Sequence, residues 1–232
     1  MPLESNHHPD TEADKRVFNV RDCTLIAVAT GQSALTLKEL LDGIHHVPAS
    51  CLYHHFWGGL LQPRFEEREY NNDFSAWVKH GLHDGELAER LAVVDPASFK
   101  TLEDLRWELC ELIEERMDES ERLSFQVATR SFEFIQSKIV VFDTRTRIAD
   151  PAALGPAIAF CSAGTIFYHF IDARRRSPDE IDDFSAWLFS FGDQYNDLIG
   201  QIAGIDPYFS SLLELRQRLS TLLTQHFEGS PS

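Results

Sequence analysis

Apolar and polar positions follow one pattern along this chain, and that pattern occurs twice. The segment 18–56 aligns without a gap with 132–170, an offset of 114 residues that keeps apolar positions in step. After a loop that is four residues shorter in the second half, the offset becomes 110, and the pentapeptide DFSAW at 73–77 recurs at 183–187. Coincidence does not keep apolar positions in step over most of two halves, so the sequence predicts an internal repeat.

Each repeat is predicted to open with a strand and to continue as helices. The opening segments VFNVRDCTLIAVAT and SFEFIQSKIVVFDT are rich in β-branched and aromatic residues, which favour strands. Capping boxes at 36–39, 101–104 and 211–214, together with Asp150-Pro151, mark helix starts. Apolar residues at helical spacing follow these starts, so helices are predicted over most of each repeat.

The pattern predicts a mainly α fold with minor β. It consists of two tandem homologous helical modules in a pseudo-twofold arrangement, each with at most one short opening strand. Residues 1–16 are polar and are predicted to form a disordered tail. The first module is predicted to span 17–124 and the second 125–232.

The charge balance narrows the classes of partner. A formal net charge of −16 and a pI of about 4.9 give a surface that repels phosphate backbones, so we expect no nucleic-acid partner. The four cysteines form no C-x-x-C pair, which argues against a zinc ribbon or a dithiol redox motif. The N-terminus lacks the apolar stretch of a signal peptide, so we expect a soluble, cytoplasmic protein.

One stretch has the composition of a membrane span. Residues 151–171 contain no Asp, Glu, Lys or Arg, and three arginines follow soon after. The stretch also holds two prolines, two glycines and a histidine, and the aligned stretch of the first repeat carries Lys38, Glu39 and Asp42. We therefore expect no contact with a membrane.

Several short motifs stand out: the related pairs YHHF and FYHF, and NDFSAW and DDFSAW, together with FYHFIDARRR and IDPYF, which each occur once. This motif set resembles an uncharacterised prokaryotic domain-of-unknown-function family of tandem helical modules. The resemblance covers nearly the whole chain after the tail. It implies the modular organisation and brings no known activity, cofactor or catalytic residue, so no cofactor is predicted.

Histidines are the first candidates for metal chemistry, because two imidazoles on one helical face converge on an ion. The aligned positions of the second repeat hold a histidine only for His55, at His169, which argues against a metal site common to both repeats. Surface or hydrogen-bonded histidines are the preferred interpretation. A metal site in the first repeat alone stays open, with four possible ligands: His54, His55, His80 and His83.

His55 and His169 lie on the apolar face of their predicted helices, and Asp73 and Asp183 open the next helix in each repeat. A buried imidazole needs polar partners, and a carboxylate is a suitable one. We therefore predict that the histidine and the aspartate meet in both repeats. The preferred interpretation is structural, with the aspartates as helix N-caps. Acid–base catalysis by the same four residues is the alternative.

Two further motifs invite a functional interpretation. Trp77 and Trp187 have the chemistry to stack on a ligand, but their helical spacing from neighbouring phenylalanines predicts that both are core residues. Arg174, Arg175 and Arg176 form a dense basic cluster in an acidic chain, and guanidinium groups bind phosphate or carboxylate. These arginines are the predicted ligand-binding residues, although nearby acidic residues can also neutralise them.

The sequence therefore predicts an uncharacterised protein that is non-catalytic and acts in binding or regulation. Its partner is a small anionic molecule or another protein, and the sequence leaves the oligomeric state open. The alternative is a hydrolase or transferase, metal-dependent or histidine-based, that uses His55 or His169. No phosphate-binding loop, dinucleotide fingerprint or hydrolase nucleophile motif supports an enzyme.

Overall fold

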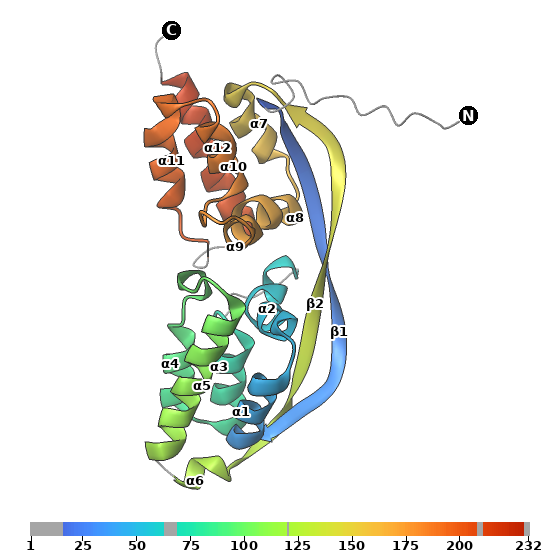
Figure 1. Ribbon diagram of the computed structural model, residues 1–232, viewed down its shortest axis with the longest axis vertical. Helices are drawn as coiled ribbons and strands as arrows, with labels where there is room; N and C mark the ends of the chain where they lie inside the picture. The colour runs from blue at the N-terminus through green and yellow to red at the C-terminus, as the bar shows by residue number, and fades with distance from the viewer. Residues whose placement is uncertain (1–15, 63–68, 120, 208–210, 230–232) are drawn as a thin grey trace, which may run out of the picture. The chain divides into compact units, whose positions relative to one another are not determined.

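The computed structural model describes residues 16–62, 69–119, 121–207 and 211–229. The chain forms two compact units (Figure 1). Unit 1 combines Met1–Asp22 with Val141–Ser232, and unit 2 is Cys23–Val140. Apart from Arg16, the predicted tail lies outside the described residues.

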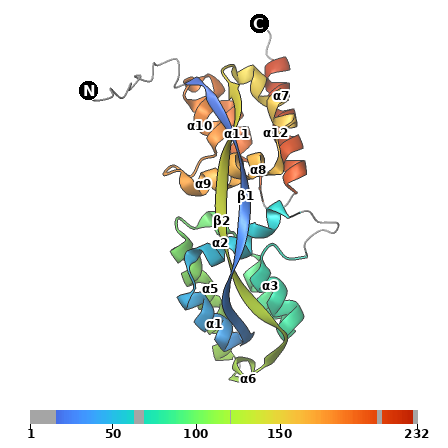
Figure 2. The same cartoon turned by 90° about the vertical axis from the view of Figure 1, so that its right-hand side faces the viewer.

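Two long strands pass from one unit into the other. β1 (Phe18–Thr36) and β2 (Val127–Ile148) pair as a two-stranded sheet (Figure 2). The hydroxyl of Thr30 donates to the carbonyl of Phe134, and the hydroxyl of Thr144 donates to the carbonyl of Val20, both at 2.6 Å. The residue numbers of the two pairs have the same sum, as a constant antiparallel register requires.

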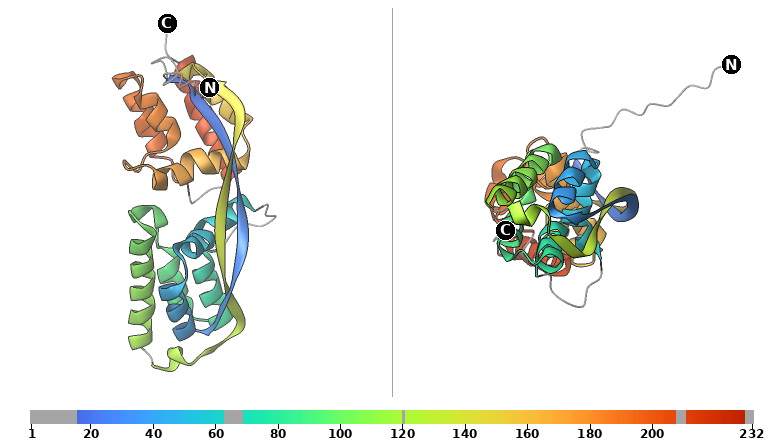
Figure 3. Two further views of the ribbon diagram at one scale, coloured as in Figure 1. Left: turned by 45° about the vertical axis from the view of Figure 1, so that its right-hand side comes forward. Right: turned by 90° about the horizontal axis from the view of Figure 1, so that it is seen from below.

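The helices of unit 2 pack beside its part of this sheet (Figure 3), and α5 contacts α1, α2 and α4. In chain order they are α1 (Leu37–His46), α2 (Ala49–Trp57), η2 (Gly58–Leu61), α3 (Asp73–Trp77), the π-helix η3 (Val78–Leu82), α4 (Gly85–Ala92), η4 (Pro96–Ser98), α5 (Leu102–Glu119) and α6 (Glu121–Ser124).

The helices of unit 1 follow β2, and α12 packs along α7. In chain order they are η5 (Pro151–Ala153), α7 (Leu154–Ala159), α8 (Ala163–Ile166), the π-helix η6 (Phe167–Asp172), α9 (Ala173–Arg176), α10 (Asp183–Phe189), η7 (Asp193–Tyr195), α11 (Asn196–Ala203) and α12 (Leu212–Glu228). No helix in the described ranges is long and apolar enough to cross a membrane. The uncharged stretch 151–171 is divided among short helices.

The predicted fold class, mainly α with minor β, is wrong. β1 has 19 residues and β2 has 22, whereas strands are usually about 3–10 residues long. Nor are the modules tandem in sequence. Unit 1 takes the start of β1 and the end of β2, so the compact units differ from the predicted modules 17–124 and 125–232.

The lengths of the strands were underestimated for a physical reason. The predicted strand segments end at 30 and 144, and the next residues, Gly31 and Arg145, have positive φ values of 78° and 64°. Such residues usually end a strand, because side chains disfavour that backbone conformation. In this sheet the pairing continues beyond both positions.

Most predicted helix starts are confirmed. The side chain of Thr36 accepts from the Glu39 amide, and Asp150 accepts from the Ala152 amide ahead of Pro151. Ser211 and Glu214 form both bonds of a capping box. These bonds satisfy amides that the first helical turn leaves unpaired.

The predicted caps of α3 and α10 are wrong by one residue. Asn72 and Asp182, rather than Asp73 and Asp183, accept from the amide three residues on, which is the N-cap bond. Both capping residues are almost fully buried. The shift leaves the carboxylates of Asp73 and Asp183 available for other partners.

Aromatic residues of the strands and helices share each core. In unit 2, Phe132 of β2 stacks on Phe74 at 5.1 Å between ring centroids and meets Trp77 at 5.8 Å. In unit 1, Phe18 of β1 lies 5.5 Å from Trp187. Trp77 and Trp187 are 9% and 7% exposed, so the prediction that both are core residues is confirmed.

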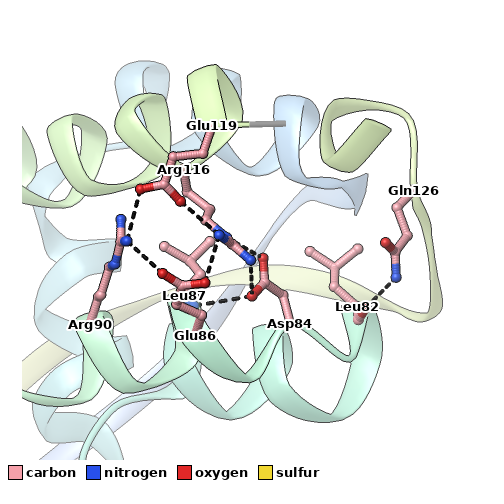
Figure 4. Close-up of polar contacts among 8 residues, drawn as sticks. All are labelled: Leu82, Asp84, Glu86, Leu87, Arg90, Arg116, Glu119 and Gln126. Carbon is pink, nitrogen blue, oxygen red and sulfur yellow. Dashed lines mark hydrogen bonds and ion pairs between the residues drawn. The ribbon is translucent and has the colours of Figure 1, made fainter. Parts of the chain in front are cut away.

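A buried ion pair fastens α5 to the start of α4 (Figure 4). Arg116 donates to Asp84 through Nε at 2.9 Å and through Nη2, and its Nη1 atom reaches Glu86 and Glu119. Asp84 is also the N-cap of α4, accepting from the Leu87 amide. Although burial opposes its ionisation, the bonds from Arg116 and Leu87 hold the pKa of Asp84 below its ordinary value.

We predict that Arg116→Met destabilises the protein by about 3–5 kcal/mol, because it leaves the buried Asp84 carboxylate unpaired. The folded-state pKa of Asp84 is lowered, so its contribution is present above about pH 4 and is lost as the pH falls through the folded pKa. Urea unfolding at pH 7 and pH 3.5 measures both effects.

The matched control is Arg147→Met, which removes an exposed ion pair with Asp143 and should change nothing measurable at pH 7. Equal effects of the two substitutions would contradict a special role for the buried pair.

Candidate functional site

His169 and Asp183 meet in unit 1, as predicted. His169 lies in the π-helix η6 and is 3% exposed, and Asp183 is the first residue of α10. The Nδ1 atom of His169 lies 2.7 Å from Oδ2 of Asp183. On the other side of the ring, Nε2 accepts a hydrogen bond of 2.8 Å from the backbone amide of Arg21. Both ring nitrogens are therefore used.

These two bonds fix the protonation of the ring. A backbone N–H can only donate, so Nε2 of His169 must carry a lone pair. The carboxylate of Asp183 can only accept, so Nδ1 must carry the proton. The imidazole is thus held as the Nδ1–H tautomer, joining the strand β1 to the helix α10.

His55 has the same arrangement in unit 2. Its Nδ1 atom lies 3.1 Å from Oδ2 of Asp73, and its Nε2 atom accepts from the amide of Ile135 at 3.2 Å. His55 is also 3% exposed. The predicted histidine–aspartate contact is therefore confirmed for both pairs, and in both the second ring nitrogen binds a strand amide.

The strand amides of Arg21 and Ile135 were not predicted from the sequence. Each strand lies against the histidine of the opposite half of the sequence, with Phe18 4.9 Å from the His169 ring and Phe132 4.6 Å from the His55 ring. A signal was available, since Arg21 and Ile135 share the 114-residue offset. The sequence has no signal for which half of the chain each strand joins.

A metal site around His54 and His55 is not favoured by their hydrogen bonds. One ligand atom each from His54, His55 and Asp73 lies within 4.8 Å of the others. Binding through Nδ1 of His55 needs a lone pair there, which moves the ring proton to Nε2 and against the Ile135 amide. His54 Nδ1 already bonds the Ser137 hydroxyl at 2.7 Å.

The other two predicted ligands lie outside this group. His80 is exposed and pairs with Glu69 at 3.0 Å. His83 is exposed and has a left-handed φ of 58° at the end of η3. Neither joins the three residues whose ligand atoms lie close together, so the structure does not bring the four predicted metal ligands together.

Two of the three clustered arginines are bound by acidic residues. Arg175 and Arg176 donate to the buried carboxylate of Asp172 at 3.0 and 2.8 Å, and Arg176 also reaches Asp183 at 3.1 Å. Although burial opposes its charge, Asp183 keeps the pKa of Arg176 above its ordinary value. These ion pairs neutralise most of the cluster.

Arg174 differs from its neighbours. Its guanidinium lies over the Phe170 ring at 4.3 Å, and among the described residues its buried Nη2 atom has no hydrogen-bond partner. Burial raises the pKa of Asp182. The hydrogen bonds from Ser185 and the positive charge of Arg174 act in the opposite direction but do not cancel this effect. Arg174 therefore retains donor capacity that its neighbours have used.

Comparison with known proteins gives a family. A model of a family of unknown function, DUF5752, matches residues 15–224. The chain belongs to this family. A structural neighbour of this DUF5752 chain, described as the structure of OrfY from Thermoproteus tenax, has a TM-score of 0.77 and 24% identity and covers 92% of this chain and 96% of the neighbour. This likeness shows the fold alone. No curated protein matches the chain.

A further cluster in the DUF5752 chain contains a cysteine, a histidine and a glutamate, but its thiol is unreactive at neutral pH. Cys110 Sγ lies 3.7 Å from Nδ1 of His45, whose Nε2 lies 3.6 Å from Glu114. Burial raises the pKa of Cys110 to about 11, so its thiol stays protonated and is a poor nucleophile. The sequence has no signal for this contact, which joins residues 65 positions apart.

We predict that His169 and Asp183 are energetically coupled in the DUF5752 chain. A double-mutant cycle with His169→Ala and Asp183→Ala should give a coupling of roughly 1–3 kcal/mol, because Asp183→Ala leaves Nδ1 of the buried His169 without its acceptor. Urea denaturation measures the four free energies of unfolding. The exposed pair His80 and Glu69 is the matched control and should show no measurable coupling. Additive effects at His169 and Asp183 would refute the link.

Proposed function

We propose that this chain is a non-catalytic binding or regulatory protein. The observation that carries the proposal is the full use of both nitrogens of His55 and His169. A residue that joins a strand amide to a helix carboxylate acts as a structural link. The histidine–aspartate contacts that suggest acid–base chemistry in the sequence are then explained by stability alone.

The alternative of a histidine-based hydrolase or transferase loses its support. A general base must present a free lone pair within hydrogen-bond reach of the substrate proton. The lone pair of His169 already accepts the Arg21 amide, and that of His55 accepts the Ile135 amide. Releasing either lone pair would detach the strand from the unit that it helps to form.

The tautomer tests this proposal directly. We predict that ¹⁵N–¹H NMR of imidazole-labelled protein near pH 8 finds His55 and His169 protonated at Nδ1 and unprotonated at Nε2. Exposed histidines such as His80 serve as internal references, because free imidazole prefers the other tautomer. A proton on Nε2 of either buried ring would return that histidine to the list of candidate bases.

A small anion is the ligand class that we propose for unit 1, with Arg174 as the contact residue. Arg175 and Arg176 are occupied by Asp172, whereas Nη2 of Arg174 is a charged donor with no partner among the described residues. A buried donor without an acceptor is costly, so an oxyanion that supplies one would bind with that cost relieved. Arg174 as a whole is partly exposed, which gives the anion an approach.

We predict that inorganic phosphate, and phosphorylated sugars and metabolites screened after it, raise the thermal midpoint of the wild-type protein, as ligands of the folded state do. Arg174→Gln should lower the affinity measured by calorimetry at least tenfold.

Arg175→Gln is the matched control and should leave the affinity within twofold, because its partner Asp172 keeps Arg176. Binding that survives Arg174→Gln, or no binding by the wild type, would contradict the anion site.

A further inference from the structure

The outward face of α5 in unit 2 carries a row of exposed residues, which we call the α5 stripe. Its members follow one another at intervals of three or four positions, so they share one face of the helix: Asp104, Trp107, Glu111, Glu115 and Asp118. The buried residues of α5 lie on the opposite face, where the helix contacts α1, α2 and α4. The stripe is therefore the face of α5 that no other helix of unit 2 needs for packing.

The charge of α5 is strongly one-sided. The helix has eight acidic residues and two arginines, whereas α12 has two acidic residues and two arginines. Both arginines of α5 turn inward. Arg106 donates to the carbonyl of Val47 at 2.9 Å, and Arg116 donates to Asp84 at 2.9 Å. The positive charges of α5 are thus used inside the unit and do not neutralise the stripe.

The acidic residues of the stripe lack cationic partners. Glu103 and Glu119, which lie beside the stripe, each pair with an arginine. Among the described residues, no ion pair or hydrogen bond reaches the side chains of Glu111, Glu115 and Asp118. Carboxylates three or four positions apart repel one another on a helix. The row therefore opposes the formation of its own helix, and a cation from outside the chain would relieve that repulsion.

α12 shows that a helix of this kind does not need such a face. The offset of 110 residues aligns α12 with α5, and the three central positions of the stripe then correspond to exposed neutral residues: Gln217, Thr221 and Gln225. α12 has 17 residues and α5 has 18, so the two helices are almost equally long. Helix formation and packing therefore do not account for a tryptophan and two glutamates at these positions.

Trp107 points to the chemistry of the partner. Its side chain is 71% exposed, whereas the other three tryptophans of the chain are buried. Tryptophan is the aromatic side chain that binds a cation best over its ring, and it is enriched among the residues that dominate protein–protein interfaces. Asp104 and Glu111 lie one helical turn before and after it. A lysine or arginine side chain over the indole would meet a carboxylate on either side.

We propose that the α5 stripe binds a segment of a partner protein that is rich in lysine and arginine. The stripe extends from residue 104 to residue 118, roughly 21 Å along the helix. An extended segment of about six or seven residues spans the same length. The negative charge of the face repels nucleic acids and anionic membranes, and the indole adds apolar contact area that a hydrated metal ion does not use. The site belongs to unit 2 and shares no residue with the proposed anion site at Arg174, so either proposal can fail without the other.

Calorimetry of the full chain with a capped octa-arginine peptide tests the site. We expect one peptide to bind in the micromolar range at low salt and more weakly at high salt, because salt screens exposed charges. A wild-type chain that does not bind the peptide at low salt would overturn the proposal. Spermine or Mg²⁺ that displaced the peptide at an equal concentration would identify a small cation as the occupant and would also overturn it.

A pair of charge-matched variants separates the stripe from the general attraction of an acidic protein. Glu111→Gln combined with Glu115→Gln should raise the peptide dissociation constant at least tenfold, because both carboxylates contact the bound cations. The control is Asp197→Asn combined with Glu228→Gln, which removes two exposed carboxylates of unit 1 and should leave the constant within twofold. Circular dichroism melts establish that both variants fold. Equal losses would show that net charge alone attracts the peptide.

Trp107 provides a local measurement that does not depend on weakening the complex. Acrylamide is uncharged and quenches exposed tryptophans, so in the free chain it should act mainly on Trp107. A saturating concentration of the peptide should reduce this quenching, because the peptide covers the ring. Trp107→Gln, which introduces the residue found at the aligned position of α12, should lower the affinity at least fivefold. Full quenching in the saturated complex would place the peptide elsewhere and overturn the proposal.

Discussion

The bond between a buried imidazole and a strand amide is the contact on which both units depend. His55 and His169 are each 3% exposed, and each has to satisfy two ring nitrogens without water. One nitrogen binds the aspartate that begins the next helix, and the other binds the amide of Ile135 or Arg21. Neither a helix nor a strand alone can provide both partners, so each unit needs a strand docked against its helices.

The strand that fits each histidine comes from the other half of the sequence. The contact between Arg21 and His169 spans 148 residues, and that between Ile135 and His55 spans 80. Both strands must therefore be long enough to serve two units, which accounts for their 19 and 22 residues. Contacts between distant residues also slow folding, because the intervening chain must close before they form.

Ion pairs within each unit determine which charged side chains remain available to bind a partner. Asp172 binds two of the three clustered arginines, and Asp84 binds Arg116 between α4 and α5. Charged groups that satisfy one another in this way contribute to the fold and are not available to ligands. Arg174 differs from them, since its Nη2 atom is a buried donor without an acceptor among the described residues.

The amino-acid sequence by itself determined the local features of this protein. Helix starts at Thr36, Asp150 and Ser211 depend on side chains within three residues of the amides they bind, so a linear pattern predicts them. The burial of Trp77 and Trp187 and the meeting of each histidine with its aspartate also follow from spacing along neighbouring helices. Only the tertiary structure decided that the strands continue past Gly31 and Arg145 and which half of the chain each strand joins. The physical reason is that Phe18 and Phe132 are chemically equivalent, and only three-dimensional packing selects the core that receives each ring.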